Sequence, residues 1–258
     1  MWLSAATASF AQQPFSTDDA AVTAPGAAHV ELFDEHDWLQ PSQRPHQRQN
    51  TINMRLNVGV GGGLELDVDA PLITIVNEPG TVPRAPFGIG DTNFGVKYNF
   101  HEEHPGAAAP AMSTAFYVET PTGDSASGLG SGVVDLWMYL VVQKSLGERV
   151  TLRINGGYLF TGNTSTGVVG IETVHGHIAT GGASIVTAVT TDWTLGVEMT
   201  AAASNAAALD HQQLQVLAGG TRALGHGLSV NVAGVAGHFV ASPRFGLLVG
   251  VAWDVAHR

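Results

Sequence analysis

The sequence predicts an all-β protein, an antiparallel transmembrane β-barrel of about 12 strands. Three observations support this fold class. Only 13% of the 258 residues are charged, against roughly 25% in ordinary soluble proteins. Apolar and polar residues alternate with period two along most of the chain, which is typical of strands with two different faces. The connections between these strands are mostly short and long in turn, as in bacterial outer-membrane barrels.

The composition argues against several other classes. Apolar residues reach 44%, so the chain is not disordered. Asp, Gly, Asn or Thr interrupts every apolar run after the N-terminus before it reaches the ~20 residues of a membrane-spanning helix. The net charge of −11 argues against a nucleic-acid partner, because phosphate binding needs basic patches. With no Cys, the chain has no disulfides, thiolate metal sites or cysteine nucleophiles.

Strand-like segments follow one another along the whole chain. In residues 51–60 every even position is apolar, while the odd positions hold Thr, Asn, Arg, Asn and Gly. Such a separation fits a strand and not a helix, because only a strand turns alternate side chains to opposite faces. The first segment is rich in charge, and those between 175 and 240 alternate weakly. The predicted strands are 27–39, 51–60, 64–72, 91–101, 111–120, 133–144, 150–161, 175–189, 193–203, 211–223, 228–240 and 245–256.

The lengths of the connections provide an independent test of the barrel. Short connections at 61–63, 145–149, 190–192 and 224–227 alternate with longer ones at 40–48, 78–90, 121–132, 162–174 and 204–210. Tight periplasmic turns and longer outer loops produce this alternation, and it places both termini in the periplasm. Two connections fit poorly, because 101–110 is long for a periplasmic turn and 241–244 is short for an outer loop.

A soluble β-sandwich or lipocalin-like barrel is the alternative fold, since its strands alternate as well. Sandwich strands average about five or six residues, whereas these segments are near ten. In a soluble protein the face opposite the core would be rich in Lys and Glu. Here that face holds mainly Asn, Thr, Gly, Gln and scattered acids, which favours the membrane barrel.

The chain is expected to comprise a signal-peptide remnant, a periplasmic segment and one barrel domain. Residues 1–11 are apolar, and Ser9-Phe10-Ala11 has the small-x-small pattern of a signal-peptidase site. A basic region is missing, so this signal looks truncated. We assign residues 12–25 to an N-terminal periplasmic segment and residues 26–258 to a single outer-membrane barrel.

Several glycine-rich phrases resemble one bacterial family. They are Phe87-Gly88-Ile89-Gly90-Asp91, Thr120-Pro121-Thr122-Gly123-Asp124, Gly128-Leu129-Gly130-Ser131-Gly132 and Asn155-Gly156-Gly157-Tyr158. In this order and spacing they are similar to the outer-membrane barrels assigned to transport in the MetA (meta-cleavage) pathway of phenol degradation. The resemblance covers roughly residues 50–258. It implies a channel in the outer membrane of a Gram-negative bacterium, for passive passage of small, aromatic or hydrophobic molecules.

The expected partners are the lipid bilayer, the outer-membrane insertion machinery and a small-molecule solute that the sequence does not identify. Insertion signals commonly end on an aromatic residue, whereas this sequence ends Ala256-His257-Arg258, with Trp253 as the nearest aromatic. A structural or adhesion barrel that transports nothing is the alternative function. No cofactor is expected.

The polar faces of the predicted strands define a candidate pathway through the barrel. Acids outnumber bases there, and three aromatic residues share the face, which would suit an apolar or aromatic solute. Buried charges must be paired or hydrated, so this interior is expected to be partly salt-bridged and partly wet. The predicted lumen-facing residues are Arg55, Glu65, Asp67, Asp69, Asp91, Lys97, Tyr117, Glu119, Asp135, Trp137, Tyr139, Arg153, Glu198 and Asp254.

Metal binding and catalysis have weaker support. The run from His101 to His104 has i, i+3 spacing in a connection, whereas zinc proteases need His at i and i+4 on a helix. His175 and His177 share a strand face, which predicts adventitious metal binding at most. A lipid-modifying enzyme is the remaining alternative, with Ser242 near His238, but no acid is close and no Gly-x-Ser-x-Gly elbow occurs.

Overall fold

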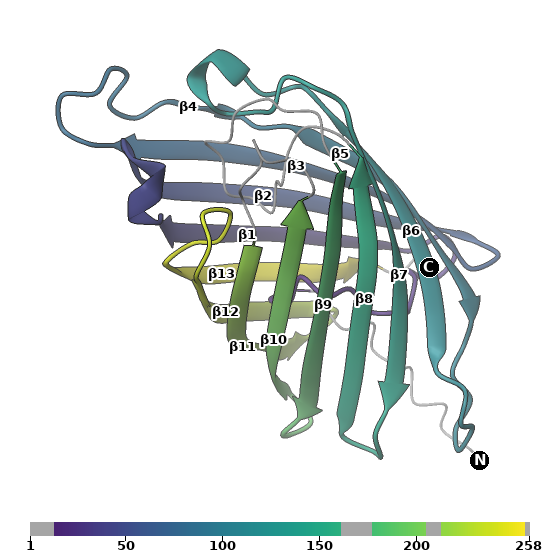
Figure 1. The fold of residues 1–258 in the computed structure, drawn as a ribbon. Helices are drawn as coiled ribbons and strands as arrows, with labels where there is room; N and C mark the ends of the chain where they lie inside the picture. Colours follow the sequence, from purple (N-terminus) through teal and green to yellow (C-terminus); the bar gives the residue numbers. More distant parts are fainter. Residues whose placement is uncertain (1–12, 161–176, 205–212, 256–258) are drawn as a thin grey trace.

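Twelve antiparallel strands close into a barrel in a computed structural model of the chain (Figure 1), which describes residues 13–160, 177–204 and 213–255. A thirteenth, short strand, β4, pairs with β3 at one rim. The predicted fold class is therefore confirmed. The strands are β1 (Ala28–Trp38), β2 (His46–Gly61), β3 (Leu64–Asn77), β4 (Phe87–Ile89), β5 (Thr92–His101), β6 (Ala111–Thr120), β7 (Asp135–Ser145), β8 (Val150–Phe160), β9 (His177–Ala188), β10 (Trp193–Ser204), β11 (Gln213–Gly225), β12 (Leu228–Gly237) and β13 (Phe245–Val255).

Each of the twelve barrel strands pairs with the next barrel strand along the chain, with β5 pairing to β3 past the short β4, and β1 closes the ring by pairing with β13. The register of this closing pair extends from Ala28 opposite Val255 to Trp38 opposite Phe245. In Figure 1 the strands of the near wall cross those of the far wall steeply, because barrel strands tilt against the barrel axis. Closure leaves no long sheet edge unpaired, as a bilayer requires.

The two ends of the barrel differ. One end, which we call the turn end, carries the first residue of β1 and the last residue of β13. It also carries short turns between strands, among them the glycine turn between β2 and β3. Gly61, Gly62 and Gly63 all have positive φ there (95°, 63° and 78°), which glycine adopts without strain. The other end, the loop end, carries 39–45, 78–91, 121–134 and 238–244, including the two 3-10 helices η1 (Pro41–Gln43) and η2 (Ser125–Ser127).

The structure extends two predicted strands and adds one. β2 begins at His46 and β3 continues to Asn77, so this hairpin projects further at the loop end than the sequence pattern predicts. β4 lies within the predicted loop 78–90. Between Ile89 and Asn93 the chain has one more residue than β3 opposite, which is a β-bulge that hides the strand period.

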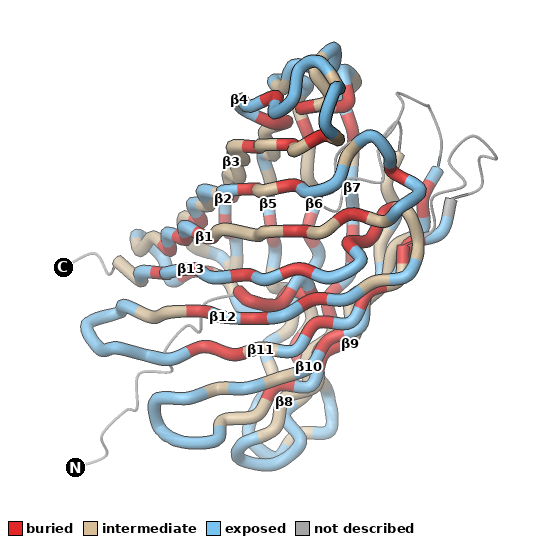
Figure 2. Tube along the Cα trace, turned by 90° about the vertical axis from the view of Figure 1, so that its left-hand side faces the viewer, coloured by how far each residue is buried: buried red, intermediate tan, exposed pale blue. Residues whose placement is uncertain are grey.

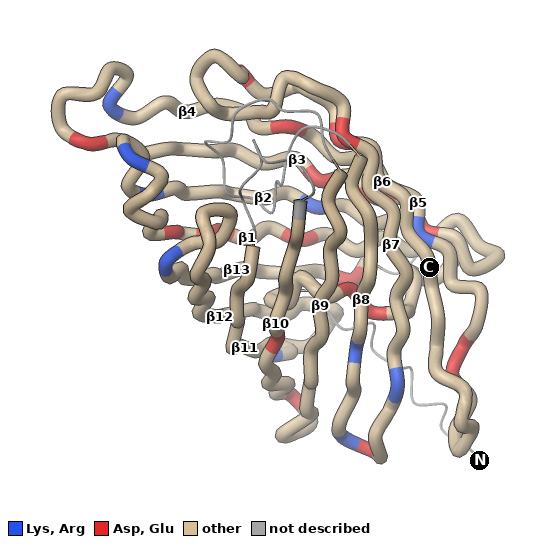
Figure 3. Tube along the Cα trace, in the orientation of Figure 1, with Lys and Arg blue, Asp and Glu red and all other residues tan. Residues whose placement is uncertain are grey.

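Burial alternates along the strands (Figure 2). The exposed positions are largely apolar, and most of the polar and charged side chains of the strands are buried inside. On β13, Phe245, Leu247, Val249, Val251 and Trp253 are 43% to 59% exposed, whereas the intervening Leu248 and Ala252 are buried. Most of the strand length carries no charge (Figure 3). The outward face therefore matches the apolar surroundings of a bilayer. No helix in the described ranges is long and apolar enough to span a membrane.

Candidate functional site: the interior of the barrel

Charged side chains inside the barrel are held in ion pairs. Arg55 on β2 donates from Nε to Asp69 on β3 at 2.7 Å and from Nη1 to Glu31 on β1 at 3.2 Å. Its side chain thereby joins three neighbouring strands. Because both acceptors are charged, each of these hydrogen bonds contributes roughly 1.5–3 kcal/mol. Arg55 is thus committed to carboxylates of the wall.

Residues 13–25, most of the segment that the sequence analysis assigns to the periplasm, lie inside the barrel, and we call them the inner segment. In Figure 1 this purple segment passes between the two walls. The backbone N–H of Thr17 donates to Glu198 on β10, and its hydroxyl lies 2.6 Å from Ser184 Oγ on β9. At the other end, Gly26 N donates to Gly59 O on β2 at 2.8 Å. Wall groups therefore satisfy the backbone of a segment that forms no strand of its own and has only an isolated bridge, between Pro25 and Gly59 of β2, among its described residues.

Two acids of the inner segment neutralise the deeply buried bases of the wall. Lys97 Nζ lies 2.9 Å from Asp18 and 3.6 Å from Asp19, and Arg153 Nη2 lies 3.5 Å from Asp19. The hydroxyl of Tyr139 donates to the second oxygen of Asp18 at 2.9 Å. Lys97 is fully buried, so that its charge would be very costly without these partners.

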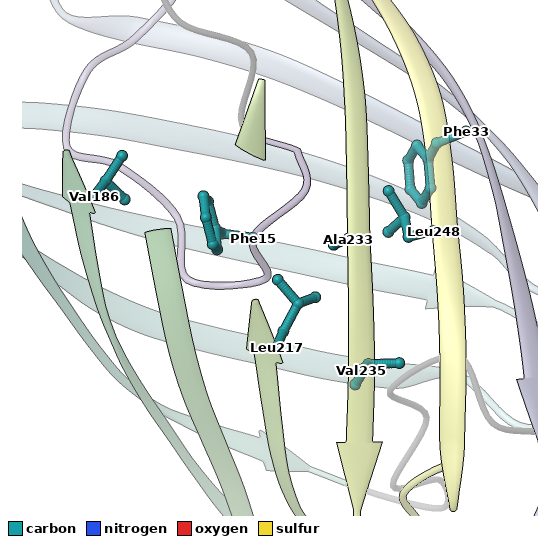
Figure 4. Close-up of a cluster of buried hydrophobic side chains, with 7 residues drawn as sticks. All are labelled: Phe15, Phe33, Val186, Leu217, Ala233, Val235 and Leu248. Carbon is teal, nitrogen blue, oxygen red and sulfur yellow. The ribbon is translucent and has the colours of Figure 1, made fainter. Parts of the chain in front are cut away.

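Apolar packing also anchors the inner segment. Phe15 is 5% exposed and packs among side chains of the wall across the lumen from Lys97 (Figure 4). The cluster around it belongs to strands β1, β9, β11, β12 and β13. Its other members are Phe33, Val186, Leu217, Ala233, Val235 and Leu248.

A loop folds inward at the loop end. Asp91, just before β5, accepts hydrogen bonds from the backbone N–H groups of Gly123 (2.9 Å) and Ser131 (2.6 Å) in the connection between β6 and β7. Leu129 of the same connection is 3% exposed and packs on Ile73 and Ile75 of β3. The loop 121–134 is thereby fixed against the inner wall.

A cavity of about 340 Å³ lies between the inner segment and this loop. Phe15, Thr17 and Asp18 of the inner segment line it, as do Leu129 and Gly130 of the loop. The surrounding wall provides both apolar and polar side chains. Those used below are Glu35, Asn53, Arg55, Asp69, Asp91, Tyr117, Glu119, Asp135, Trp137 and Tyr139.

Three aromatic rings form one surface of the cavity. Tyr117 and Tyr139 are stacked with 5.9 Å between ring centroids and an interplanar angle of 8°. Trp137 lies 4.6 Å from Tyr139 and is 36% exposed. The Tyr117 hydroxyl donates to Asp67 at 2.7 Å, so the polar ends of both tyrosines are engaged. Tyr139 itself is 7% exposed, so Trp137 is the more accessible ring of this surface. Such a surface can stack with a planar apolar molecule.

The fourteen predicted lumen residues fall into three groups. Those that line the cavity are Arg55, Asp69, Asp91, Tyr117, Glu119, Asp135, Trp137 and Tyr139. Those bonded beneath it, to the inner segment or to wall residues, are Glu65, Asp67, Lys97, Arg153 and Glu198. Asp254 lies at the turn end and pairs with His29 at 2.6 Å. Whether any of them contacts a moving solute stays a prediction.

Sequence reasoning missed the residues that complete this interior. Glu31 and Glu35 belong to the charge-rich first strand, where the alternation was too weak to assign faces. The inner segment, with Phe15, Asp18 and Asp19, follows no period at all. One signal in the sequence was available. The acids Asp18 and Asp19 directly precede a barrel whose predicted lumen has three bases, Arg55, Lys97 and Arg153, that need partners.

The histidine run in the β5–β6 connection is a structural turn. His101 Nδ1 pairs with the carbonyl of Pro110 at 2.8 Å, and Glu103 accepts from Lys144 Nζ (2.7 Å) and Ser145 N (2.9 Å). Slight burial opposes ionisation, but these hydrogen bonds outweigh it and lower the pKa of Glu103. His175 lies outside the described residues. Within the described ranges no group of three His, Cys, Asp or Glu side chains could hold a metal.

Ser242, the candidate nucleophile, is fully buried near the loop end. Its hydroxyl donates to Leu214 O at 3.2 Å and accepts from Leu214 N at 3.1 Å. These bonds hold the loop 238–244 against β11. A hydroxyl committed to the backbone in this way fits a structural role, since nucleophilic catalysis needs an adjacent base.

Closed antiparallel strands, an apolar outer belt and a polar interior define a transmembrane β-barrel of the outer-membrane class. Within that class, the chain belongs to the family described as "Putative MetA-pathway of phenol degradation", whose model matches residues 51–255. The resemblance predicted from the glycine-rich phrases is therefore confirmed. A search of curated proteins found no match.

Solved structures with similar folds are outer-membrane barrels. The NanC porin superposes with a TM-score of 0.59 at 8% identity, over 87% of this chain and 98% of that chain. The KdgM porin has a TM-score of 0.57 at 10% identity, over 88% and 99%. The translocator domain of the autotransporter NalP from Neisseria meningitidis has a TM-score of 0.52 at 10% identity, over 88% and 87%. At these identities the likeness concerns the fold, and it confirms the outer-membrane barrel.

Proposed function

We propose that the protein is a passive conduit for small molecules across the outer membrane, and that its solutes are aromatic or otherwise apolar. The observation that carries this proposal is the aromatic surface of Tyr117, Trp137 and Tyr139 inside a closed barrel. A ring stacked in this way gains about 0.5–1.5 kcal/mol beyond burial of its area. Membership of a phenol-degradation family supports the same class of solute.

Uptake into proteoliposomes tests the proposal. Purified protein in vesicles should admit benzyltrimethylammonium faster than an aliphatic quaternary ammonium ion of similar size, because the aliphatic ion cannot stack and neither ion crosses a protein-free bilayer quickly. Trp137→Ala should reduce that preference. Phe116→Ala is the matched control, since Phe116 lies on the neighbouring strand β6, next to the Trp137 partner Tyr117, but faces outward at 38% exposure. Vesicles as tight as protein-free ones, or a preference that Trp137→Ala leaves intact, would contradict the proposal.

A structural barrel that transports nothing is the second candidate, and the inner segment is the observation in its favour. Asp18, Asp19 and Ala20 are each at most 7% exposed within the turn-end half of the barrel. A filled interior of this kind suits a scaffold as well as a channel. The uptake experiment separates the two, because a scaffold admits neither ion.

The proposal contains no catalytic step, and it extends to one partner. The similar solved structures are porins and an autotransporter domain, not enzymes. We infer that the outer-membrane insertion machinery assembles the chain and meets its last strand, β13, with Trp253 exposed at 53%. Binding of a β13 peptide to that machinery, lost on Trp253→Ala, would test this inference.

A further inference from the structure

We propose that the inner segment, residues 13–25, closes the turn-end half of the barrel, and that solute leaves the cavity on that side only when the Asp18 and Asp19 ion pairs open. This inference rests on the proposed passage of solutes. It assigns the control of passage to a part of the chain that precedes the first strand.

The inner segment is bound to wall residues around most of the barrel. Gln13 bonds to Glu31 on β1 and Thr221 on β11, and Ala20 O accepts from Asn99 on β5 and Ser113 on β6. With Glu198, Ser184, Arg153, Tyr139 and Glu65, these contacts involve strands β1, β3 and β5 to β11. A segment that merely hung into an open pore would not bond to opposite walls.

Burial shows that the space around the segment is filled. Thr17 is 1% exposed and Ala20 is 0% exposed, although each belongs to a chain with no strand partner. The wall beneath is equally buried, with Lys97 and Val141 at 0%. Water in an open channel would reach one side of these residues, so the segment and the wall together occupy this half of the lumen.

The wall is also shaped for the segment by glycine. A Cβ on Gly59 of β2 would lie 2.2 Å from the backbone oxygens of Thr23 and Ala24. A Cβ on Gly182 of β9 would lie 2.6 Å from Thr17, and one on Gly196 of β10 would lie 2.7 Å from Phe15. Three strands therefore have no side chain where the segment approaches most closely.

The charges explain how the closed state can still open. Asp18 and Asp19 face Lys97 and Arg153, while the nearby wall carries its own acids, Glu65, Asp67 and Glu198. When the segment moves away and water enters, these wall acids remain close enough to compensate the two bases. The wall can thus supply other partners for Lys97 and Arg153 when their ion pairs with Asp18 and Asp19 break. We call these ion pairs the latch.

A cysteine pair tests the proposal in the 258-residue chain, which contains no Cys. Thr17 Oγ1 and Ser184 Oγ are 2.6 Å apart, so Thr17→Cys with Ser184→Cys places two sulfurs within bonding reach. In this background, Asp18→Asn with Asp19→Asn removes the latch. Single-channel conductance in planar bilayers is measured with the disulfide formed and reduced, and unboiled gel mobility confirms that each variant is folded.

We expect the reduced, unlatched variant to conduct several-fold more than the reduced parent, and the disulfide to abolish this gain. Glu103→Gln in the same background is the control, because it removes an ion pair outside the lumen and should leave conductance unchanged. Failure of the disulfide to form, or equal conductance of folded latched and unlatched channels, would overturn the inference while passage itself stands. If neither conducts, the proposed conduit falls, and the inference with it.

Discussion

The carboxylate of Asp91 accepts the backbone N–H of Ser131 at 2.6 Å and so connects the start of β5 to the loop before β7. Its other oxygen accepts from Gly123 N. Three of the glycine-rich phrases that carry the family resemblance, 87–91, 120–124 and 128–132, therefore meet in space around one carboxylate. The glycines and the acid of these phrases thus share one structural role, which is to hold the loop 121–134 inside the loop end of the barrel.

Asp91→Ala should release this loop. Two backbone donors lose a charged acceptor, and hydrogen bonds to charged groups contribute roughly 1.5–3 kcal/mol each. We expect proteinase K to cleave within 121–134 much faster in the folded variant than in the parent. Asp124→Ala is the control, since the Asp124 carboxylate accepts from Ala126 N and the Ser127 hydroxyl of η2, within the loop itself. Equal cleavage of the Asp91 variant and the parent would show that Leu129 packing alone fixes the loop.

The two faces of β2 should differ in their tolerance of charge. Met54 is 45% exposed on the outer face, whereas the adjacent Asn53 lines the cavity. Met54→Arg should destabilise the folded barrel in lipid by about 2–4 kcal/mol, because an arginine near the bilayer midplane is poorly solvated. Asn53→Arg should cost clearly less. Urea titration in lipid vesicles measures both. Equal losses would mean that the two faces do not differ as assigned, and a larger loss for Asn53→Arg would reverse the assignment.

Passage through the barrel should favour cations. Glu35, Glu119 and Asp135 line the cavity, where Arg55 is the one base among the described lining residues. The segments 161–176 and 205–212, which lie outside the described residues, contain no Lys or Arg. The reversal potential in a salt gradient should show cation preference that weakens at high ionic strength.

Glu35→Gln with Glu119→Gln should reduce this preference. Glu148→Gln, at the exposed β7–β8 turn, provides a charge-matched control that should not. Anion preference in the parent, or the same change with the control, would mean that these carboxylates do not face the ion path.

The Glu103–Lys144 pair should stabilise the β5–β6 connection in a pH-dependent way. Its hydrogen bonds lower the pKa of Glu103 below the ordinary 4.5, so the stabilisation is complete above that value and is lost as the pH falls through the folded-state pKa. Glu103→Gln should therefore cost up to about 1 kcal/mol at pH 7 and nothing at strongly acid pH. Urea unfolding at both pH values checks this, and a cost that persists in acid would point to packing.

The barrel could be predicted from the sequence because its pattern is local. The apolar character of a residue such as Leu56 or Val249 indicates that it lies on the outer face. The same alternation of apolar and polar residues repeats along every strand with a clear pattern. β4 escaped this reasoning because a bulge between Ile89 and Asn93 shifts the period by one residue. The weak alternation of β1 likewise concealed Glu31 as a partner of Arg55.

The interior was harder to predict for a different physical reason. The inner segment has no regular secondary structure, so its place depends on contacts with residues up to the far end of the chain, such as Thr221 with Gln13. No periodicity encodes such contacts. The acids and aromatic rings of the wall could be assigned to a face, but not the partner that Lys97 or Tyr139 would find there.

The β1–β13 pairing has a consequence for biogenesis. These strands are more than two hundred positions apart, yet each supplies the other's entire hydrogen-bonded edge. A polypeptide without β13 would therefore leave two strand edges with unpaired backbone N–H and C=O groups facing lipid, which is energetically costly. The ring can therefore close only after the last strand, β13, has been synthesised. The inner segment must be enclosed at that moment, or it must enter the closed barrel from the turn end. Premature truncation should yield degraded protein and no smaller pore.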